Sequence, residues 1–197
     1  MANYVKNEIT VIGNEQVQNK MKEFMEIFQS SDKRMDTKFF AEVFYKNPQF
    51  GEESNGWYID NLGTKWAYME DINEDTEFTV TSAWSPVTEF IQHLYNILVE
   101  LDPDVSVENR FEDEGYNPVG GMVVYNGMYS YGEEYDFEYP NEDEMDEDDD
   151  YDKLMDDFYE NIDSTKSSLI HACRASIERG QGTPIEYREE EIETENN

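Results

Sequence analysis

The order in which strand-like and helix-like patterns follow one another is the feature that most constrains the fold of this chain. A strand with one buried face alternates apolar and polar side chains, whereas an amphipathic helix repeats its apolar side chains every three or four positions. Between residues 3 and 111 these patterns occur as strand, helix, strand, strand, helix and strand. The segments are 3–12, 17–28, 64–70, 76–83, 87–101 and 105–111.

This order matches the βαββαβ arrangement of ferredoxin-like α+β folds. We therefore expect an antiparallel sheet with two helices on one face, and we expect Phe24 and Leu94 of these helices to be buried. A candidate N-cap, Ser85, precedes the second helix. Two further strand-like segments, 119–125 and 129–139, flank an Asn-Gly pair and predict an extra β-hairpin.

The remaining segments carry weaker patterns. Residues 39–45 fit either a helix or a strand, and residues 47–56 have the composition of a loop. Residues 153–179 have the apolar spacing of one or two amphipathic helices, with Ser164 as a candidate cap of the second. We therefore expect a ferredoxin-like domain, an acidic linker segment, a C-terminal helical element and a disordered acidic tail. Their ranges are 1–140, 141–152, 153–180 and 187–197.

Acidic residues are concentrated in the middle of the sequence. The chain of 197 residues has 47 acidic and 14 basic residues, which gives a formal net charge of −33. Residues 66–152 contain 26 acidic residues and one basic residue, Arg110, whereas residues 1–65 contain ten acidic and eight basic residues. A charge of this sign and size repels nucleic acid and anionic membranes and attracts basic partners. We therefore expect a basic protein partner and no direct binding to nucleic acid or membranes.

The sequence lacks the usual patterns of secretion, membrane insertion and catalysis. A single cysteine, Cys173, forms no internal disulfide, the N-terminal residues have no signal-peptide pattern, and no apolar run is long enough to span a bilayer. We therefore expect a cytoplasmic protein. Asp146, Asp148 and Asp150 have the first spacings of a calcium loop, but Tyr151 occupies the position that requires glycine. Since phosphate-loop and nucleophile motifs are also lacking, we expect no enzyme activity, no cofactor and no dedicated metal site.

All three tryptophans of the chain fall in two short motifs, WYIDNLGTKW and AWSP. One interpretation is a shallow aromatic pocket that stacks a nucleotide base or a peptide ring. The other is a structural corner in which the rings close the end of the sheet. The candidate pocket residues are Trp57, Asn61, Lys65, Trp66 and Trp84.

The densest run of acidic residues is the second candidate site. Thirteen of the 20 residues from Glu133 to Asp152 are acidic, and aromatic residues are interleaved with them. Carboxylates on one face recur about every 6.6 Å along a strand and about every 5.4 Å along a helix, so they can imitate the phosphates of nucleic acid. The alternative is an acidic linker that only keeps the protein in solution. The candidate partner-binding residues are Glu133, Glu134, Tyr135, Asp136, Phe137, Glu138, Asp143, Asp146, Asp148, Asp149 and Asp150.

Four motifs in the first 140 residues resemble those of a known family. They consist of Asn3, Val5, Asn7, Ile9, Val11 and Gly13; Trp57, Asn61, Gly63, Thr64, Lys65 and Trp66; Ala83, Trp84, Ser85 and Pro86; and Glu114, Gly115, Tyr116, Gly120 and Gly121. In these motifs the chain resembles the YubB-type ferredoxin-like domain family of phage and plasmid proteins. The resemblance implies a mobile-element origin and a ferredoxin-like fold, but no particular activity.

Three functions are compatible with these observations. The first is an acidic phage-type accessory protein that acts as a DNA mimic or anti-defence inhibitor by binding a basic, nucleic-acid-handling host protein. The second is a small-ligand or nucleotide-binding module that uses the tryptophan corner. The third is a scaffold protein that forms homo-oligomers through its C-terminal helices.

Overall fold

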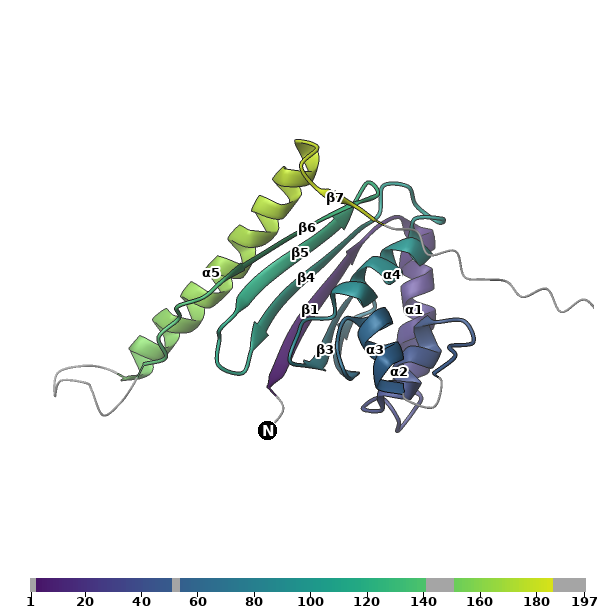
Figure 1. Ribbon diagram of the computed structural model, residues 1–197, viewed down its shortest axis with the longest axis horizontal. Coiled ribbons are helices and arrows are strands. Elements are labelled where there is room, and N and C mark those ends of the chain that lie inside the picture. Colours follow the sequence, from purple (N-terminus) through teal and green to yellow (C-terminus); the bar gives the residue numbers. More distant parts are fainter. Residues whose placement is uncertain (1–2, 51–53, 141–150, 186–197) are drawn as a thin grey trace, which may run out of the picture.

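The computed structural model describes residues 3–50, 54–140 and 151–185, and it is a mixed α+β structure (Figure 1). Within these residues, seven strands form one sheet in the order β2-β3-β1-β4-β5-β6-β7, and every neighbouring pair is antiparallel. The strands are β1 (Tyr4–Ile12), β2 (Ala67–Glu74), β3 (Glu77–Ala83), β4 (Ser106–Asp113), β5 (Val119–Tyr125), β6 (Met128–Glu134) and β7 (Thr183–Pro184).

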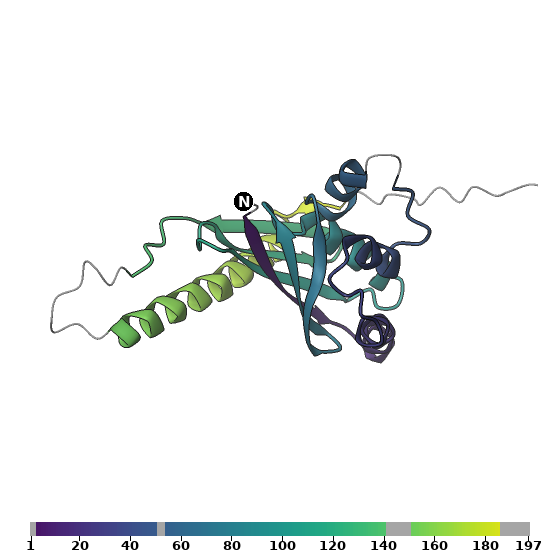
Figure 2. The same ribbon diagram turned by 90° about the horizontal axis from the view of Figure 1, so that it is seen from below.

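The same residues contain five helices, which lie on the two faces of the sheet. Figures 1 and 2 show α1–α4 gathered on one side of the molecule and the long α5 on the other. Alternate side chains of β5 point to opposite faces of the sheet. Met122 and Val124 belong to the core beneath α1–α4, whereas Val123 packs against α5. The helices are α1 (Glu15–Gln29), α2 (Thr37–Phe44), α3 (Ser54–Leu62), α4 (Thr88–Leu98) and α5 (Tyr151–Glu178).

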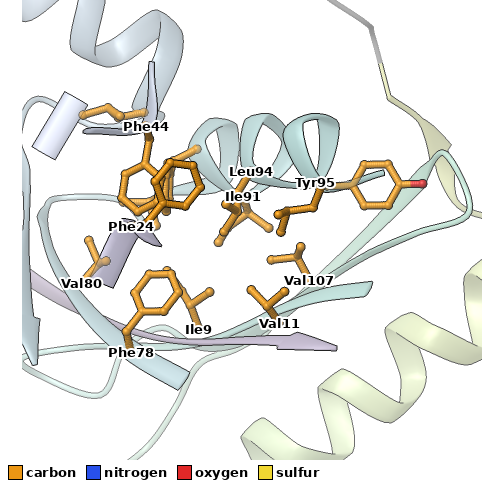
Figure 3. Close-up of a cluster of buried hydrophobic side chains, with 14 of the residues drawn as sticks. Ile9, Val11, Phe24, Phe44, Phe78, Val80, Ile91, Leu94, Tyr95 and Val107 are labelled. Atoms are coloured by element: carbon orange, nitrogen blue, oxygen red, sulfur yellow. The ribbon is translucent and has the colours of Figure 1, made fainter. Parts of the chain in front are cut away.

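The main core lies between α1, α2, α4 and the sheet, and it combines aliphatic side chains with a group of aromatic rings (Figure 3). Phe24 and Leu94 are buried, as the helical spacing predicted. The ring centroid of Phe44 in α2 lies 4.9 Å from that of Phe24 and 4.8 Å from that of Phe90. Rings bury a large area each, which explains how a chain with 38% hydrophobic residues forms a continuous core.

Hydrogen bonds of a buried asparagine join the central strands to α4. The Nδ2 of Asn7 in β1 donates to the carbonyl oxygen of Val80 at 3.0 Å and to the Oγ of Ser82 at 2.9 Å, both in β3. Its Oδ1 accepts from the backbone N–H of Val87 and from the Nδ2 of Asn109 in β4, at 3.1 Å each. Asn7 is fully buried, so these bonds satisfy polar groups that would otherwise be costly to bury.

Several expected elements have different bounds or types. Residues 39–45 belong mostly to helix α2, and α3 begins inside the segment 47–56 that was expected to be a loop. Strand β6 ends at Glu134, so the second strand of the hairpin is shorter than predicted. Ser85 does not cap α4, because its Oγ donates instead to the carbonyl oxygen of Gly63 at 2.7 Å.

In the C-terminal region, where one or two amphipathic helices were expected, there is one. Helix α5 is continuous through Ser164, which therefore caps no second helix. The sheet has seven described strands instead of the six expected, because the two residues of β7 pair with β6. The acidic segment 141–150 and the tail from residue 186 lie outside the described residues.

Candidate functional site

Exposed acidic side chains gather where β6 ends and α5 begins. From Glu133 to Asp163 the sequence contains 17 acidic residues and one basic residue, Lys153. We call the described and exposed acids of this region the acidic end, and we leave out Asp163 because it pairs with Lys166. Its residues are Glu133, Glu134, Asp136, Glu138, Asp152, Asp156, Asp157 and Glu160.

The first half of α5 arranges four of these acids on its outer side. Asp152, Asp156 and Glu160 follow one another at intervals of four residues, so they lie about 6 Å apart along the axis and share one face of the helix. Asp157 extends this face. Asp156, Asp157 and Glu160 were not among the predicted partner-binding residues, although their positions away from the apolar stripe of 153–179 were a usable signal.

An apolar cluster fixes the start of α5 and the segment after β6 to the sheet. Phe158 and Ile162 are buried against Val119 of β5, and Phe137 packs against the same cluster. The side chain of Asn117 also holds Phe137: its Nδ2 donates to the Phe137 carbonyl oxygen at 3.1 Å, and its Oδ1 accepts from the Phe137 N–H at 3.3 Å. Phe137, a predicted partner-binding residue, therefore supports the surface from within.

Three tyrosine side chains beside the acidic end face solvent. Tyr135 is 55% exposed, Tyr139 is 51% exposed and Tyr159 is 42% exposed. The ring of Tyr139 lies 5.3 Å from that of Phe158, which lies 5.6 Å from that of Tyr159. The hydroxyl of Tyr135 donates to Glu133 at 2.6 Å, and this hydrogen bond raises the pKa of Tyr135. The acids are therefore interspersed with exposed rings that are available for apolar contacts.

Helix α5 approaches the sheet closely because glycines lie beneath it. A Cβ atom on Gly121 of β5 would lie 3.1 Å from the Cδ1 of Ile170 and 3.3 Å from its backbone nitrogen. A Cβ atom on Gly132 of β6 would lie 3.3 Å from Leu169. The thiol of Cys173 is buried on the same side, and burial raises its pKa. The two glycines thus allow α5 to seat Ile170 and Cys173 against β5 and β6.

Charged side chains also hold α5 to the sheet. The Nζ of Lys166, which is buried, lies 3.0 Å from Glu8 of β1 and 2.9 Å from Glu112 of β4. Burial alone would lower the pKa of Lys166, but its bond to Glu112 and the charges of Glu112 and Glu8 raise it above its ordinary value. Arg174 pairs in the same way with Glu108 of β4 at 2.6 Å. Lys166 and Arg174 therefore neutralise acidic residues of the sheet, and their ion pairs do not involve the acidic end.

The predicted tryptophan pocket is divided between two regions. Trp57 in α3 packs at the edge of the main core, with its ring 5.0 Å from those of Tyr45 and Phe50. Trp66 lies just before β2 and contacts other rings, namely Tyr4 at 5.4 Å and Tyr68 at 5.8 Å. Across residues 3–50, 54–140 and 151–185, no two tryptophan rings are in contact.

The other predicted pocket residues have varied surroundings. The Nδ2 of Asn61 donates to the carbonyl oxygen of Trp57 at 2.8 Å. Lys65 is exposed, and Trp84 is 58% exposed with a φ of 71°. The hydroxyl of Thr64 donates to the carbonyl oxygen of Ala83 at 2.5 Å. The bonds of Asn61 and Thr64 therefore serve the local backbone.

The remaining predicted partner-binding residues are Asp143, Asp146, Asp148, Asp149 and Asp150, and all of them lie outside the described residues. Within the described part of the chain, no group of three or more His, Cys, Asp or Glu residues is placed to hold a metal ion. A surface cavity of about 320 Å³ lies between α5 and the sheet, and its lining includes Arg110 and Asp163 but no tryptophan.

Comparisons with known proteins identify no relative. No protein-family model, curated protein or solved structure matches this chain. Among the helices of the described residues, none combines the length and apolar character required to cross a bilayer.

Proposed function

We propose that this chain is an accessory protein that acts by binding, without catalysis, and that its acidic end occupies the basic groove of a nucleic-acid-handling protein. The observation that carries this proposal is the row of exposed acids on α5, which a buried apolar cluster fixes to the sheet. An array on a packed helix presents its charges in a defined geometry. A solvated linker offers no such geometry, so its charges attract partners without selecting among them.

The spacing of the acids suits a groove that binds phosphates. Carboxylates about 6 Å apart along α5 give a lower linear charge density than one strand of B-DNA, which has a phosphate about every 3.4 Å of its axis. The acids that follow β6 add charges beside the helix. Lysine and arginine side chains are long and flexible, so a phosphate-binding groove tolerates this difference in spacing.

The exposed rings distinguish this surface from one that is merely acidic. Aromatic side chains near the centre of an interface contribute most of the binding energy, whereas charges at its rim chiefly accelerate association. Tyr135, Tyr139 and Tyr159 stand among the acids and have ring area to bury. The acidic end therefore combines steering charges with apolar anchors.

We further propose that residues 1–140 form a ferredoxin-like domain of the YubB type that includes the extra β5–β6 hairpin, and that α5 is added to this domain. The strand order β2-β3-β1-β4 supports this, because β1 lies inside this group of four strands. Helices follow β1 and β3 in the chain, as in the βαββαβ arrangement. The resemblance to phage and plasmid proteins favours a mobile-element protein that acts in the host cytoplasm. The partner would then be a host enzyme, such as a defence nuclease.

The test is affinity capture from a bacterial lysate with two matched variants that each remove four negative charges. One variant carries D152N, D156N, D157N and E160Q at the acidic end. The other carries D71N, E74Q, D75N and E77Q at the β2–β3 hairpin, where the acids are also exposed.

The proposal predicts that wild type and the hairpin variant capture the same DNA- or RNA-binding protein, and that the acidic-end variant captures much less of it. Equal losses in both variants would mean that net charge alone attracts the partner. Undiminished capture by the acidic-end variant would contradict the proposal directly.

A further inference from the structure

A row of aromatic rings lies at the same end of the strands as the acidic end. The rings of Tyr4 and Trp66 are 5.4 Å apart and steeply inclined, and those of Trp66 and Tyr68 are 5.8 Å apart and nearly parallel. We call these three residues the ring row. Tyr4 is 47% exposed, and the other two are partly exposed, so the row has ring surface that the fold itself does not use.

The ring row lies on a part of the sheet that no described helix covers. Val5 and Met69 are buried, so Tyr4 and Tyr68 next to them in the strands project to the opposite face. That face is the one on which α5 lies, but α5 packs against β4, β5 and β6, whereas the ring row lies on β1 and at the start of β2. In the strand order, β1 and β2 lie beyond β4, so the ring row lies beside α5 and not beneath it.

A strained tryptophan adjoins the ring row. Trp84 has a φ of 71°, a left-handed conformation that is unfavourable for a bulky residue, and its side chain is 58% exposed. Its backbone N–H donates to the carbonyl oxygen of Asn3 at 2.9 Å, and the N–H of Ala83 donates to that of Trp66 at 3.1 Å. These bonds hold the backbone of Trp84 beside the ring row. Strain that the surroundings maintain is typical of binding sites.

The charge of the protein selects the kind of ligand that these rings can stack. Aromatic faces attract cations such as guanidinium and ammonium groups, and they also stack nucleobases. A net charge of −33 opposes the approach of phosphates and favours cations. Two exposed acidic residues also lie close by. Glu70 accepts a hydrogen bond from the hydroxyl of Thr81, and the backbone N–H of Glu114, just after β4, donates to the carbonyl oxygen of Tyr4.

We propose that the ring row binds arginine or lysine side chains of a protein partner by stacking. This inference rests on the proposed function, because the same basic partner would contact the ring row and the acidic end. Tyr4 on β1 and Glu134 on β6 lie at the same end of the sheet, three strands apart. With about 4.8 Å between neighbouring strands, this separation is about 14 Å. A single protein interface spans that distance easily.

The experiment uses the full chain with ¹⁵N-labelled tryptophan and the peptide Gly-Arg-Gly-Arg-Gly-Arg as the probe. The three indole N–H signals report separately on Trp57, Trp66 and Trp84, and Trp57 serves as an internal control because it packs at the core. We expect the Trp66 signal to shift saturably with the peptide while the Trp57 signal stays in place. The variant Tyr4→Ser should weaken the affinity read from Trp66 about three- to fivefold, the factor expected for one exposed cation–π contact.

Two controls separate this inference from the proposed function. The acidic-end variant should still show the Trp66 shift, so a failed capture experiment leaves this measurement interpretable. The peptide Gly-Gln-Gly-Gln-Gly-Gln should leave Trp66 unshifted. An unmoved Trp66 signal at saturating arginine peptide, or a stronger shift with oligothymidylate than with the arginine peptide, would overturn the assignment.

Discussion

The Nζ of Lys166 lies 2.9 Å from the Oε2 of Glu112, and this contact joins α5 to a strand 54 residues earlier in the sequence. The same ammonium group also contacts Glu8 and Asp163, both at 3.0 Å. The side chain of Lys166 is 4% exposed and that of Glu112 is 16% exposed, so water screens this pair only weakly. Together with the apolar clusters of Phe158 and Ile170, this contact holds α5, and with it the acidic end, on the sheet.

Replacing Lys166 by alanine should therefore lower the free energy of unfolding by about 3 kcal/mol, because Glu112 would lose its close cation and keep only the longer pair with Lys6, at 3.9 Å. The matched control is Lys22→Ala, since Lys22 makes an exposed pair with Glu26 at 4.0 Å. It should cost less than about 0.5 kcal/mol. Urea unfolding followed by circular dichroism measures both, and equal costs would contradict the structural role of Lys166.

The contribution of Glu8 to the free energy of unfolding should depend on pH. Burial alone would raise the pKa of Glu8, but its hydrogen bond to Lys6 and its interactions with Lys166 lower it below the ordinary 4.5. A carboxyl whose pKa is lowered on folding stabilises the protein fully above pH 4.5, and its contribution is lost as the pH falls through the folded value. The difference in unfolding free energy between wild type and Glu8→Gln should therefore be constant from pH 5 to 8 and shrink below about pH 4. A difference that grows on acidification would exclude this role.

Substitution of Gly121 should affect α5 specifically. Alanine in a strand normally improves on glycine, but here its Cβ would come within 3.3 Å of the backbone nitrogen of Ile170, which cannot move independently of the helix. We expect Gly121→Ala to lower the melting temperature and to accelerate amide exchange in α5 before the main core. Gly56→Ala is the control, because nothing lies within 4 Å of the added Cβ in α3. It should stabilise the protein by up to about 1 kcal/mol.

The tryptophans should differ in their importance for stability. Trp57→Ala should cost about 3 kcal/mol, because it leaves a cavity next to Tyr45 and Phe50. Trp84→Gly should leave stability unchanged or raise it slightly, because Trp84 is exposed and glycine adopts its φ of 71° without strain. Chemical unfolding of the two variants decides between a structural corner and an exposed binding residue. A large loss of stability in Trp84→Gly would show that its indole is structural.

Much of the fold could be predicted from the sequence because local patterns determine it. The stripes of α1 and α4 and the Asn-Gly turn between β5 and β6 each lie within one short segment. Helix α3 was missed because Ser54–Leu62 has little apolar periodicity, and it is held instead by contacts such as those of Tyr58 in the core. Strand β7 has two residues and therefore shows no pattern at all.

The arrangement of the site depends on contacts between distant segments, which the sequence pattern did not reveal. That α5 packs beside β5 follows from glycines at 121 and 132, whose role appears only when the helix lies over them. The proximity of the three tryptophans was inferred from two neighbouring motifs, but helix α3 places Trp57 at the core, in contact with other rings. Acidic residues were recognised by their density up to Asp152, whereas those further along α5 were less dense and were not included.

Competition between this chain and duplex DNA for the captured partner tests the central claim most directly. The fluorescence anisotropy of the labelled chain, bound to the purified partner, is followed as unlabelled DNA is added at two salt concentrations. We expect DNA to displace the chain completely, and we expect the affinity of the chain to fall steeply as salt rises, because both ligands would use the same basic groove. Simultaneous binding of chain and DNA, with an affinity indifferent to salt, would contradict the proposal that the acidic end replaces nucleic acid.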